Sequence, residues 1–273
     1  MASDLKRKPA VAGTFYPERP GELKRMLQGY LDQSGVHPAG SGVRVLVVPH
    51  AGYIYSGPTA ACAFRRVAEC DIDRVILLGC SHHDSFDGAS IFMQGSFQTP
   101  LGDFPVDEDF AARLADRVET SDSKPHAQEH ALEVELPFLA MTVGIVPIVP
   151  VLFGSPFGPP SIHFANVLAE LAGDRDLVLA SSDLSHYLTE EQANAIDHTT
   201  LDTLLKKDVQ AFAEAVQSGC CSVCSLAAVA IAMVYSLESG AEEWSLLNYS
   251  TSAHASGDTS RVVGYAALPM ERA

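Results

Sequence analysis

The segment Val43-Arg-Val-Leu-Val-Val48, followed by Pro49-His-Ala-Gly-Tyr-Ile-Tyr-Ser-Gly57, decides the fold class. Its first part is short, β-branched and almost wholly apolar, which is typical of a strand buried on both faces of a sheet. The change to proline, glycine and histidine marks the end of that strand. A buried strand that ends in a polar loop is a building unit of α/β proteins.

Similar apolar runs follow along the chain at residues 74–78, 146–153 and 176–181, and the prolines of the second run indicate a strand end or an edge strand. Helical patterns alternate with these runs at residues 22–31, 58–69, 108–118, 129–141, 162–171, 190–216 (two helices broken near 207–208) and 221–237. Two strand-like segments, 244–251 and 261–268, close the chain. This alternation predicts a single-domain α/β sandwich over residues 1–273 with a mostly parallel central sheet.

Composition and charge argue against two classes of partner. The 273 residues carry 18 Lys+Arg against 34 Asp+Glu, a formal net charge of −16 at pH 7. Nucleic acid and anionic membrane surfaces are bound through clustered cations, so neither is the expected partner. No apolar stretch reaches the roughly 20 residues that span a bilayer. No export signal follows the basic N-terminus, and the cysteines follow no disulfide pattern, so a reducing cytoplasm is the expected location.

Three of the predicted strands end in loops that carry histidine. His50 follows the first strand, His82 follows the second, and the segment from Asp183 to His186 follows the fourth. The carboxyl ends of parallel strands meet at one edge of a sheet, where ligands bind in open α/β folds. A single such histidine is as readily a buried core residue. Three at matching positions predict a shared site.

Imidazoles that converge with a carboxylate suit a divalent metal, and two histidines with one carboxylate and open positions suit non-haem iron. The same residues also suit metal-free acid–base chemistry. His82 and His83 are adjacent, so only one is expected to face the cleft. Asp183 and His186 are three residues apart and lie on one side of a turn, where Asp183 could orient a nearby histidine.

A second group of titratable residues is Gln128-Glu-His-Ala-Leu-Glu-Val-Glu135. It lacks the H-E-x-x-H order of metalloproteases, so that chemistry is not inferred. The glutamates are interpreted as a solvated helical face, and most of the acidity of the chain is expected to lie on such helix faces and on surface turns. His130, near the start of that predicted helix, is the expected functional member.

Cys220-Cys221-x-x-Cys224 resembles half of a zinc site, but the chain has no second pair of cysteines to complete it. We therefore interpret these cysteines as buried positions of an apolar helix. Phosphate-binding glycine loops and the G-x-S-x-G motif of α/β-hydrolases are absent from the sequence.

In combination, the motifs resemble those of one known family, the Memo family (Memo-like, AmmeMemoRadiSam system protein B). The matching segments run almost from end to end of the chain: Ala12-Gly-Thr-Phe-Tyr-Pro17, Pro49-His-Ala-Gly-Tyr53, Gly79-Cys-Ser-His-His83, Thr99-Pro-Leu101, Glu129-His130 with Glu133 and Leu136-Pro137, Ser181-Ser-Asp-Leu-Ser-His186 and Val263-Gly-Tyr-Ala266.

The resemblance implies a fold similar to that of class III extradiol (LigB-type) non-haem iron dioxygenases, with the site at one edge of the sheet. By motif, His50 and His82 match the two metal-type histidines of the family. Asp183 and His186 match the pair that faces them, and His130 matches a further histidine of the cleft.

The third metal ligand does not follow from the motifs. In the dioxygenases it is a late glutamate, and in some Memo proteins it is a cysteine near the C-terminal strand. This chain has neither at an evident match. His254, in Ser252-Ala-His-Ala-Ser256, lies in that region and is the predicted third ligand.

Three functions are compatible with these residues. The first is a metal-dependent oxidoreductase similar to a dioxygenase, with Fe(II) as the expected ion, Cu or Zn as alternatives, and His186, Asp183 and His130 as proton-handling groups. The second is a non-catalytic binding or signalling module that holds a peptide or protein in the same cleft. The third is metal-free hydrolysis. The family also implies association with a radical-SAM protein and an AMMECR-type protein.

Overall fold

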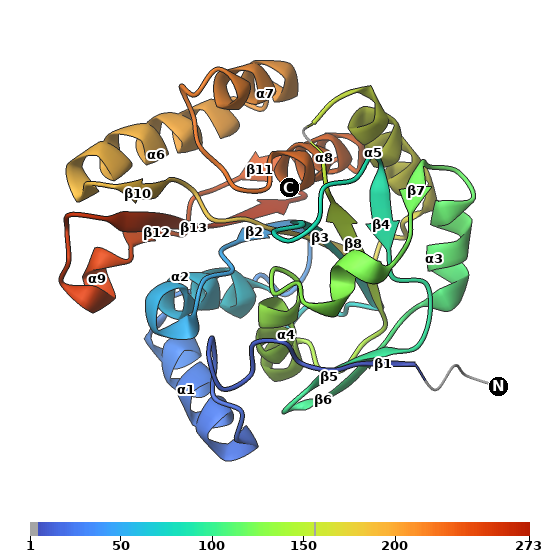
Figure 1. The fold of residues 1–273 in the computed structure, drawn as a ribbon, viewed down its shortest axis with the longest axis horizontal. Coiled ribbons are helices and arrows are strands. Elements are labelled where there is room, and N and C mark those ends of the chain that lie inside the picture. The colour runs from blue at the N-terminus through green and yellow to red at the C-terminus, as the bar shows by residue number, and fades with distance from the viewer. Residues whose placement is uncertain (1–4, 156) are drawn as a thin grey trace.

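Four parallel strands form the centre of a ten-stranded sheet, in the order β2-β9-β3-β8. Their bounds are β2 (Val43–Val48), β9 (Asp176–Ser181), β3 (Arg74–Cys80) and β8 (Ile148–Phe153). The computed structural model describes residues 5–155 and 157–273, and Figure 1 shows the sheet with helices on both of its faces. Parallel strands require crossover connections, and helices in these connections bury both faces.

Antiparallel strands flank this centre on both sides. β13 pairs with β2, and β4 pairs with β8. The flanking strands are β13 (Val262–Glu271), β10 (His186–Leu188), β11 (Glu243–Trp244), β12 (Asn248–Thr251), β4 (Ala89–Ile91) and β7 (Thr120–Ser121). A separate small sheet contains β1 (Lys6–Arg7), β5 (Ser96–Thr99) and β6 (Gly102–Pro105). The predicted α/β fold with a mostly parallel central sheet is confirmed.

The helices divide between the two faces of the sheet. α1, α2 and α4 lie on one face, and α5, α6, α7 and α8 lie on the other (Figure 1). The bounds are α1 (Pro20–Gln33), α2 (Tyr53–Arg66), α3 (Glu108–Ala115), α4 (Leu136–Thr142), α5 (Pro159–Leu171), α6 (Glu190–Leu204), α7 (Val209–Gln217), α8 (Leu226–Glu238), α9 (Ala253–Ser256) and the 3₁₀ helices η1 (Lys124–Ala127) and η2 (Glu133–Glu135). In the described ranges, no helix has the length and apolar character needed to cross a membrane.

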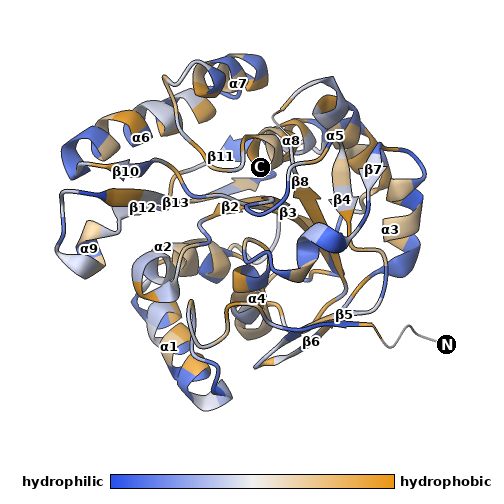
Figure 2. Ribbon diagram, in the orientation of Figure 1, coloured by the Kyte–Doolittle hydropathy of each residue, from blue (hydrophilic) through white to orange (hydrophobic). Residues whose placement is uncertain are grey.

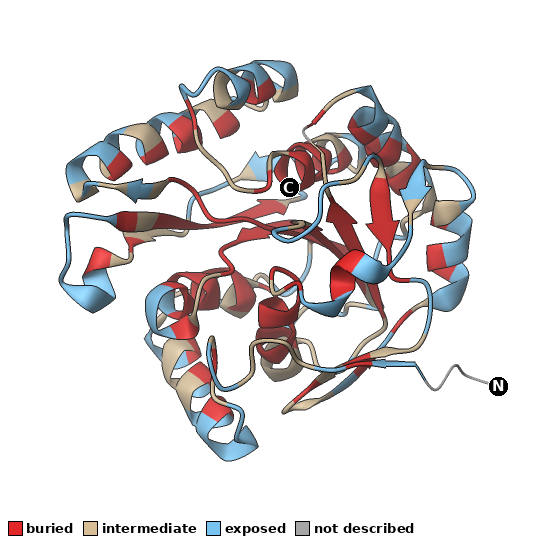
Figure 3. Ribbon diagram, in the orientation of Figure 1, coloured by how far each residue is buried: buried red, intermediate tan, exposed pale blue. Residues whose placement is uncertain are grey.

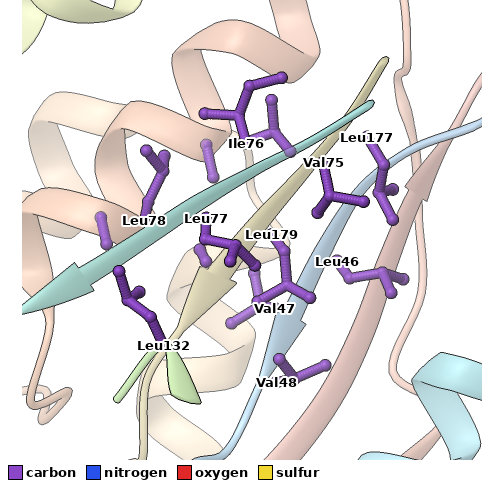
Figure 4. Close-up of a cluster of buried hydrophobic side chains, with 14 of the residues drawn as sticks. Leu46, Val47, Val48, Val75, Ile76, Leu77, Leu78, Leu132, Leu177 and Leu179 are labelled. Carbon is purple, nitrogen blue, oxygen red and sulfur yellow. The ribbon is translucent and has the colours of Figure 1, made fainter. Parts of the chain in front are cut away.

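The core lies on and between the central strands. Every residue of β2, β8 and β9 is buried, and Figures 2 and 3 show the same strands as hydrophobic and inaccessible. Figure 4 shows how side chains from adjacent strands, such as Leu46, Leu77 and Leu179, meet on the sheet. This rigid centre fixes the positions at which the strands end, and so the positions of the loops that follow them.

Two elements differ from the sequence prediction because of proline. The prediction that a helix begins at Pro58 is wrong, since α2 begins at Tyr53 and contains Pro58. Because Pro58 has no N–H, only the helical hydrogen bond to the Ile54 carbonyl oxygen is missing, and Ile54 lies at the exposed start of the helix. β8 is not an edge strand, because it lies between β3 and β4. The missing N–H of Pro150 removes only one hydrogen bond at the end of the β4–β8 ladder, where the Phe92 N–H still donates to the Pro150 carbonyl oxygen at 3.0 Å.

Three helix predictions can be compared directly with the structure. The predicted break near residues 207–208 is confirmed, because α6 ends at Leu204 and Asp208 caps α7. The segment 129–141 is not one helix but a loop followed by η2 and α4. The segment 221–237 becomes helical only at Leu226, which leaves Cys224 in the preceding turn.

Candidate metal centre

The carboxyl ends of β2, β3 and β9 bring the predicted histidine loops together. The ring centroids of His50 and His82 are 5.1 Å apart, and those of His82 and His130 are 4.5 Å apart. His186 Nε2 lies 4.0 Å from Asp183 Oδ2. The loop that carries His130 packs closely on β3 at Gly79, where a Cβ atom would lie only 2.9 Å from Leu132 Cδ2.

Two histidines and a cysteine form a set of potential metal ligands. One donor atom from each of His50, His82 and Cys224 lies within 4.8 Å of the others. Cys224 Sγ is 3.4 Å from His50 Nε2, and it accepts a hydrogen bond from the Asp183 backbone N–H at 3.1 Å. A second set in the described part of the chain consists of His82, Glu129 and His130. Imidazole and thiolate donors of this kind bind first-row transition metals.

A hydrogen bond with Ser181 fixes the orientation of the His50 ring. Ser181 Oγ lies 2.8 Å from His50 Nδ1, 2.7 Å from the Ala131 carbonyl oxygen and 2.9 Å from Glu135 Oε1. A hydroxyl has one proton to donate and the carbonyl can only accept, so His50 Nδ1 carries the proton of its hydrogen bond to Oγ. The lone pair of His50 is then on Nε2, which faces Cys224. A ligand histidine held through its other nitrogen is the usual arrangement at metal sites.

Glu129 orients His82 in the same way. Its Oε1 lies 2.8 Å from His82 Nδ1, and Oε2 accepts the His82 backbone N–H at 2.6 Å. The backbone N–H groups of His130 and Ala131 also donate to Oε1, at 2.8 and 2.9 Å. Burial alone raises the pKa of Glu129, but the hydrogen bonds from His82 and from backbone N–H groups lower it to about 2. Glu129 is therefore an ionised acceptor. Because it binds His82 through Nδ1, the Nε2 atom of His82 is available to a metal.

The interpretation of the glutamates as a solvated face is wrong. Glu129, Glu133 and Glu135 are all 2% exposed or less. Glu133 accepts hydrogen bonds from the backbone of Ala10 and Val11, at 2.7 and 3.0 Å. The helical spacing of these residues suggested one exposed face. Instead, each carboxyl group is buried because it accepts hydrogen bonds from groups elsewhere in the chain, such as Ala10, His82 and Ser181.

Burial keeps several imidazoles neutral. It lowers the pKa of His50 well below the usual range, lowers that of His130 to about 4, and also lowers that of His186. Burial has the same tendency at His82, but hydrogen bonds to Cys80 and Glu129 raise the pKa of His82 to about 10. Metal binding at His82 must therefore displace a proton. Burial also raises the pKa of Asp183 to about 7.

The structure does not bring His254 to this cluster. His254 is exposed on α9, lines a separate hollow with Tyr55 and Tyr249, and belongs to neither set of potential ligands in the described ranges. α9 follows β12, which pairs with β13, and lies at the left edge of the molecule, whereas β3 lies near its centre (Figure 1). The third donor beside His50 and His82 is Cys224.

Sequence reasoning missed Cys224 because it placed the cysteine inside the apolar helix. The signal that could have found it is Ser225, a residue type that favours the N-cap position and occupies that position in α8, although its side chain makes no capping hydrogen bond. A helix that begins after Ser225 leaves Cys224 in a loop at the same sheet edge.

Together, the fold and the site define an α/β protein with a histidine–cysteine centre of the metal-binding type at the carboxyl edge of its parallel strands. The Memo-like protein family model matches residues 7–269, and the chain belongs to this family.

Curated relatives cover nearly the whole chain. A MEMO1 family protein of Methanocaldococcus jannaschii is 36% identical over 97% of this chain and 99% of its own. Those of Desulfurococcus amylolyticus and Methanopyrus kandleri are each 34% identical, over 96% and 98% of this chain and 98% and 100% of their own. A solved structure of an uncharacterized protein from Escherichia coli K12 has a TM-score of 0.49 and 11% identity, over 83% of this chain and 99% of that chain.

Proposed function

We propose that the protein binds a first-row transition metal through His50, His82 and Cys224 and uses it in a redox reaction. The observation that supports this most directly is the convergence of three donor atoms within 4.8 Å. The residues fit a metal because Ser181 and Glu129 each hold the Nδ1 of one histidine and leave its Nε2 available.

Iron(II) is the ion that the family resemblance favours. Copper and zinc fit the same donors, because imidazole binds all three metals and thiolate favours copper and zinc. A bound iron or copper ion would supply one-electron chemistry toward a small molecule. No redox-active group other than cysteine is present among the side chains of this cluster, so the proposed activity depends on the metal.

The surrounding residues would bind the small molecule and handle its protons. His130 is neutral at pH 7, because its pKa is about 4, and it stacks on His82. His186 lies 4.0 Å from the carboxyl group of Asp183, whose pKa is about 7. A carboxyl group that titrates near neutrality next to an imidazole suits general acid–base catalysis. We assign the proton-handling roles to His186, Asp183 and His130.

Metal analysis tests the proposal. Protein purified anaerobically and reloaded with Fe(II), Cu or Zn should hold about one ion per chain, and His50→Ala, His82→Ala and Cys224→Ser should each bind it more weakly. His254→Ala is the matched control, because an exposed histidine outside the cluster should not affect binding. Negligible uptake of all three metals by the wild type would contradict the proposal. If the wild type binds metal, oxygen consumption with catechol-type compounds tests the redox role. Consumption that stops when a chelator is added would support it.

Exposed apolar residues near the site support a second candidate function, the binding of a peptide or protein. Ile54 and Tyr55 follow the His50 loop and are 57% and 38% exposed, and Tyr187, next to His186, is 64% exposed. Tyr187 also has a positive φ of 62°, a strained conformation that is often found at functional sites. Binding of a partner that survives removal of all metal would favour this function over the first.

A further inference from the structure

A second cysteine, Cys80, lies at the metal centre and has no role in the three-donor set. It is the last residue of β3, two positions before His82. Its Sγ lies 3.6 Å from His82 Nε2, the ring nitrogen that Glu129 leaves free. The side chains of Cys80 and Cys224 also interact as hydrogen-bonding partners. Cys80 therefore contacts two of the three donors.

Two sulfur–nitrogen pairs in this cluster have the spacing of two ligands of one ion, although Cys80 itself lies outside both sets of donors within 4.8 Å of one another in the described residues. With metal–nitrogen bonds of about 2.0–2.1 Å and metal–sulfur bonds of about 2.3 Å, two tetrahedral donors stand about 3.6 Å apart. The Cys80 Sγ–His82 Nε2 and Cys224 Sγ–His50 Nε2 distances are 3.6 and 3.4 Å. Each sulfur thus lies at ligand spacing from a different imidazole.

The two thiols are also free to reach a common ion. Neither cysteine is in a disulfide, and both are partly exposed. They line the same hollow of about 310 Å³, together with Ser81, Phe153 and Gly154. The two thiols therefore border one shared space.

We propose that Cys80 is a fourth protein ligand of this centre, which makes it a site of two histidines and two cysteines. This role of Cys80 rests on the proposed metal-binding function and specifies the metal class. A second thiolate favours the thiophilic ions Zn(II) and Cu(I) over Fe(II). Four protein donors also close the coordination sphere, so an incoming small molecule must displace one of them.

Cobalt(II) spectroscopy can count the thiolate ligands, because each cobalt–thiolate bond contributes charge-transfer absorption in the near ultraviolet. The reduced full-length protein should show tetrahedral d–d bands and a charge-transfer band of two-thiolate intensity. Cys80→Ser and Cys224→Ser should each lose about half of that intensity. Loss of a group that supports a metal ligand typically weakens binding by roughly 10–100-fold. Because each of these substitutions removes a ligand itself, each should weaken zinc binding by at least this factor.

Cys220→Ser is the matched control, because Cys220 is exposed and, among the described residues, does not line the hollow that Cys80 and Cys224 share. It should keep the full intensity. If Cys80→Ser keeps the full intensity while Cys224→Ser abolishes it, the role of Cys80 is refuted and the three-donor site stands. If the wild type binds neither cobalt nor zinc, the proposed function itself fails.

X-ray absorption of the zinc-loaded wild type provides a test that does not depend on the folding of a variant. Two sulfur and two nitrogen neighbours at bonding distance would support the proposal, with sulfur at about 2.3 Å. One sulfur neighbour would overturn it.

Discussion

At the scale of single residues, the centre depends on carboxyl groups in two different states. Glu129 is ionised, because four N–H groups donate to it and lower its pKa to about 2. Burial raises the pKa of Glu135 well above its usual range, which favours the protonated form of this carboxyl group, and Glu135 Oε1 accepts a hydrogen bond from the Ser181 hydroxyl. The first group fixes His82 by charge, whereas the second supports His50 indirectly.

Substitution of each glutamate by glutamine should separate these two roles. Glu129→Gln replaces an acceptor with an amide that cannot accept all four bonds, so we expect metal affinity to fall by about 10–100-fold. The Glu135→Gln side chain is neutral, as is the protonated carboxyl group that burial favours at this position, so the substitution should change metal affinity less than about threefold. Competition with a chromogenic chelator measures both affinities. Equal losses in the two variants would contradict the assignment.

At the scale of elements, the sequence allowed prediction of the strands better than of the segments between them. β2 and β9 match the predicted bounds, because a short β-branched run flanked by polar residues has few alternatives. The segment that begins at Glu129 has helical spacing, but backbone N–H groups of its own loop and of His82 bind the carboxylate instead. Such tertiary bonds are invisible in a local pattern, whereas Ser225 was a local signal for the position of Cys224 outside α8.

The contact between α6 and β13 predicts a sharp difference between two glycine substitutions. A Cβ atom at Gly264 would lie 1.8 Å from Asp197 Oδ2, whereas a Cβ atom at Gly29, inside α1, would have no neighbour within 4 Å. Gly264→Ala should therefore destabilise the protein by about 1–3 kcal/mol or more. Gly29→Ala should stabilise it by about 0.5–1 kcal/mol, because alanine favours the helix. Urea unfolding measures both, and a stable Gly264→Ala protein would refute this packing.

The break between α6 and α7 makes a second prediction at this scale. The Asp208 side chain caps α7 by accepting the Ala211 N–H at 3.0 Å. Asp208→Ala should lower the free energy of unfolding by about 1 kcal/mol. Asp202→Ala, at an exposed position of α6, should stay within about 0.5 kcal/mol of the wild type. If the two variants unfold at the same denaturant concentration, the cap contributes nothing.

At the scale of the whole molecule, part of the acidity lies inside the protein. The net charge of −16 includes Glu129 and Glu133, which are buried beside cationic or N–H partners. Glu133 forms an ion pair with Arg7 of β1, and Arg7 also donates to the backbone oxygens of His126 and Glu129. The start of the chain is thereby joined to the loop that supports the metal centre, more than 100 residues away in sequence.

The buried pair of Arg7 and Glu133 predicts that the N-terminal segment is essential for stability. Arg7→Met removes the cation and leaves Glu133, which is 0% exposed, as an unpaired buried charge. Breaking a buried pair in this way costs about 3–5 kcal/mol. Lys6→Met is the matched control, because the pair of Lys6 with Asp103 is solvent-exposed and should contribute about 1 kcal/mol or less. Denaturant unfolding compares the two variants, and similar small losses in both would show that Glu133 keeps sufficient partners in Ala10, Val11 and Tyr16 without the arginine.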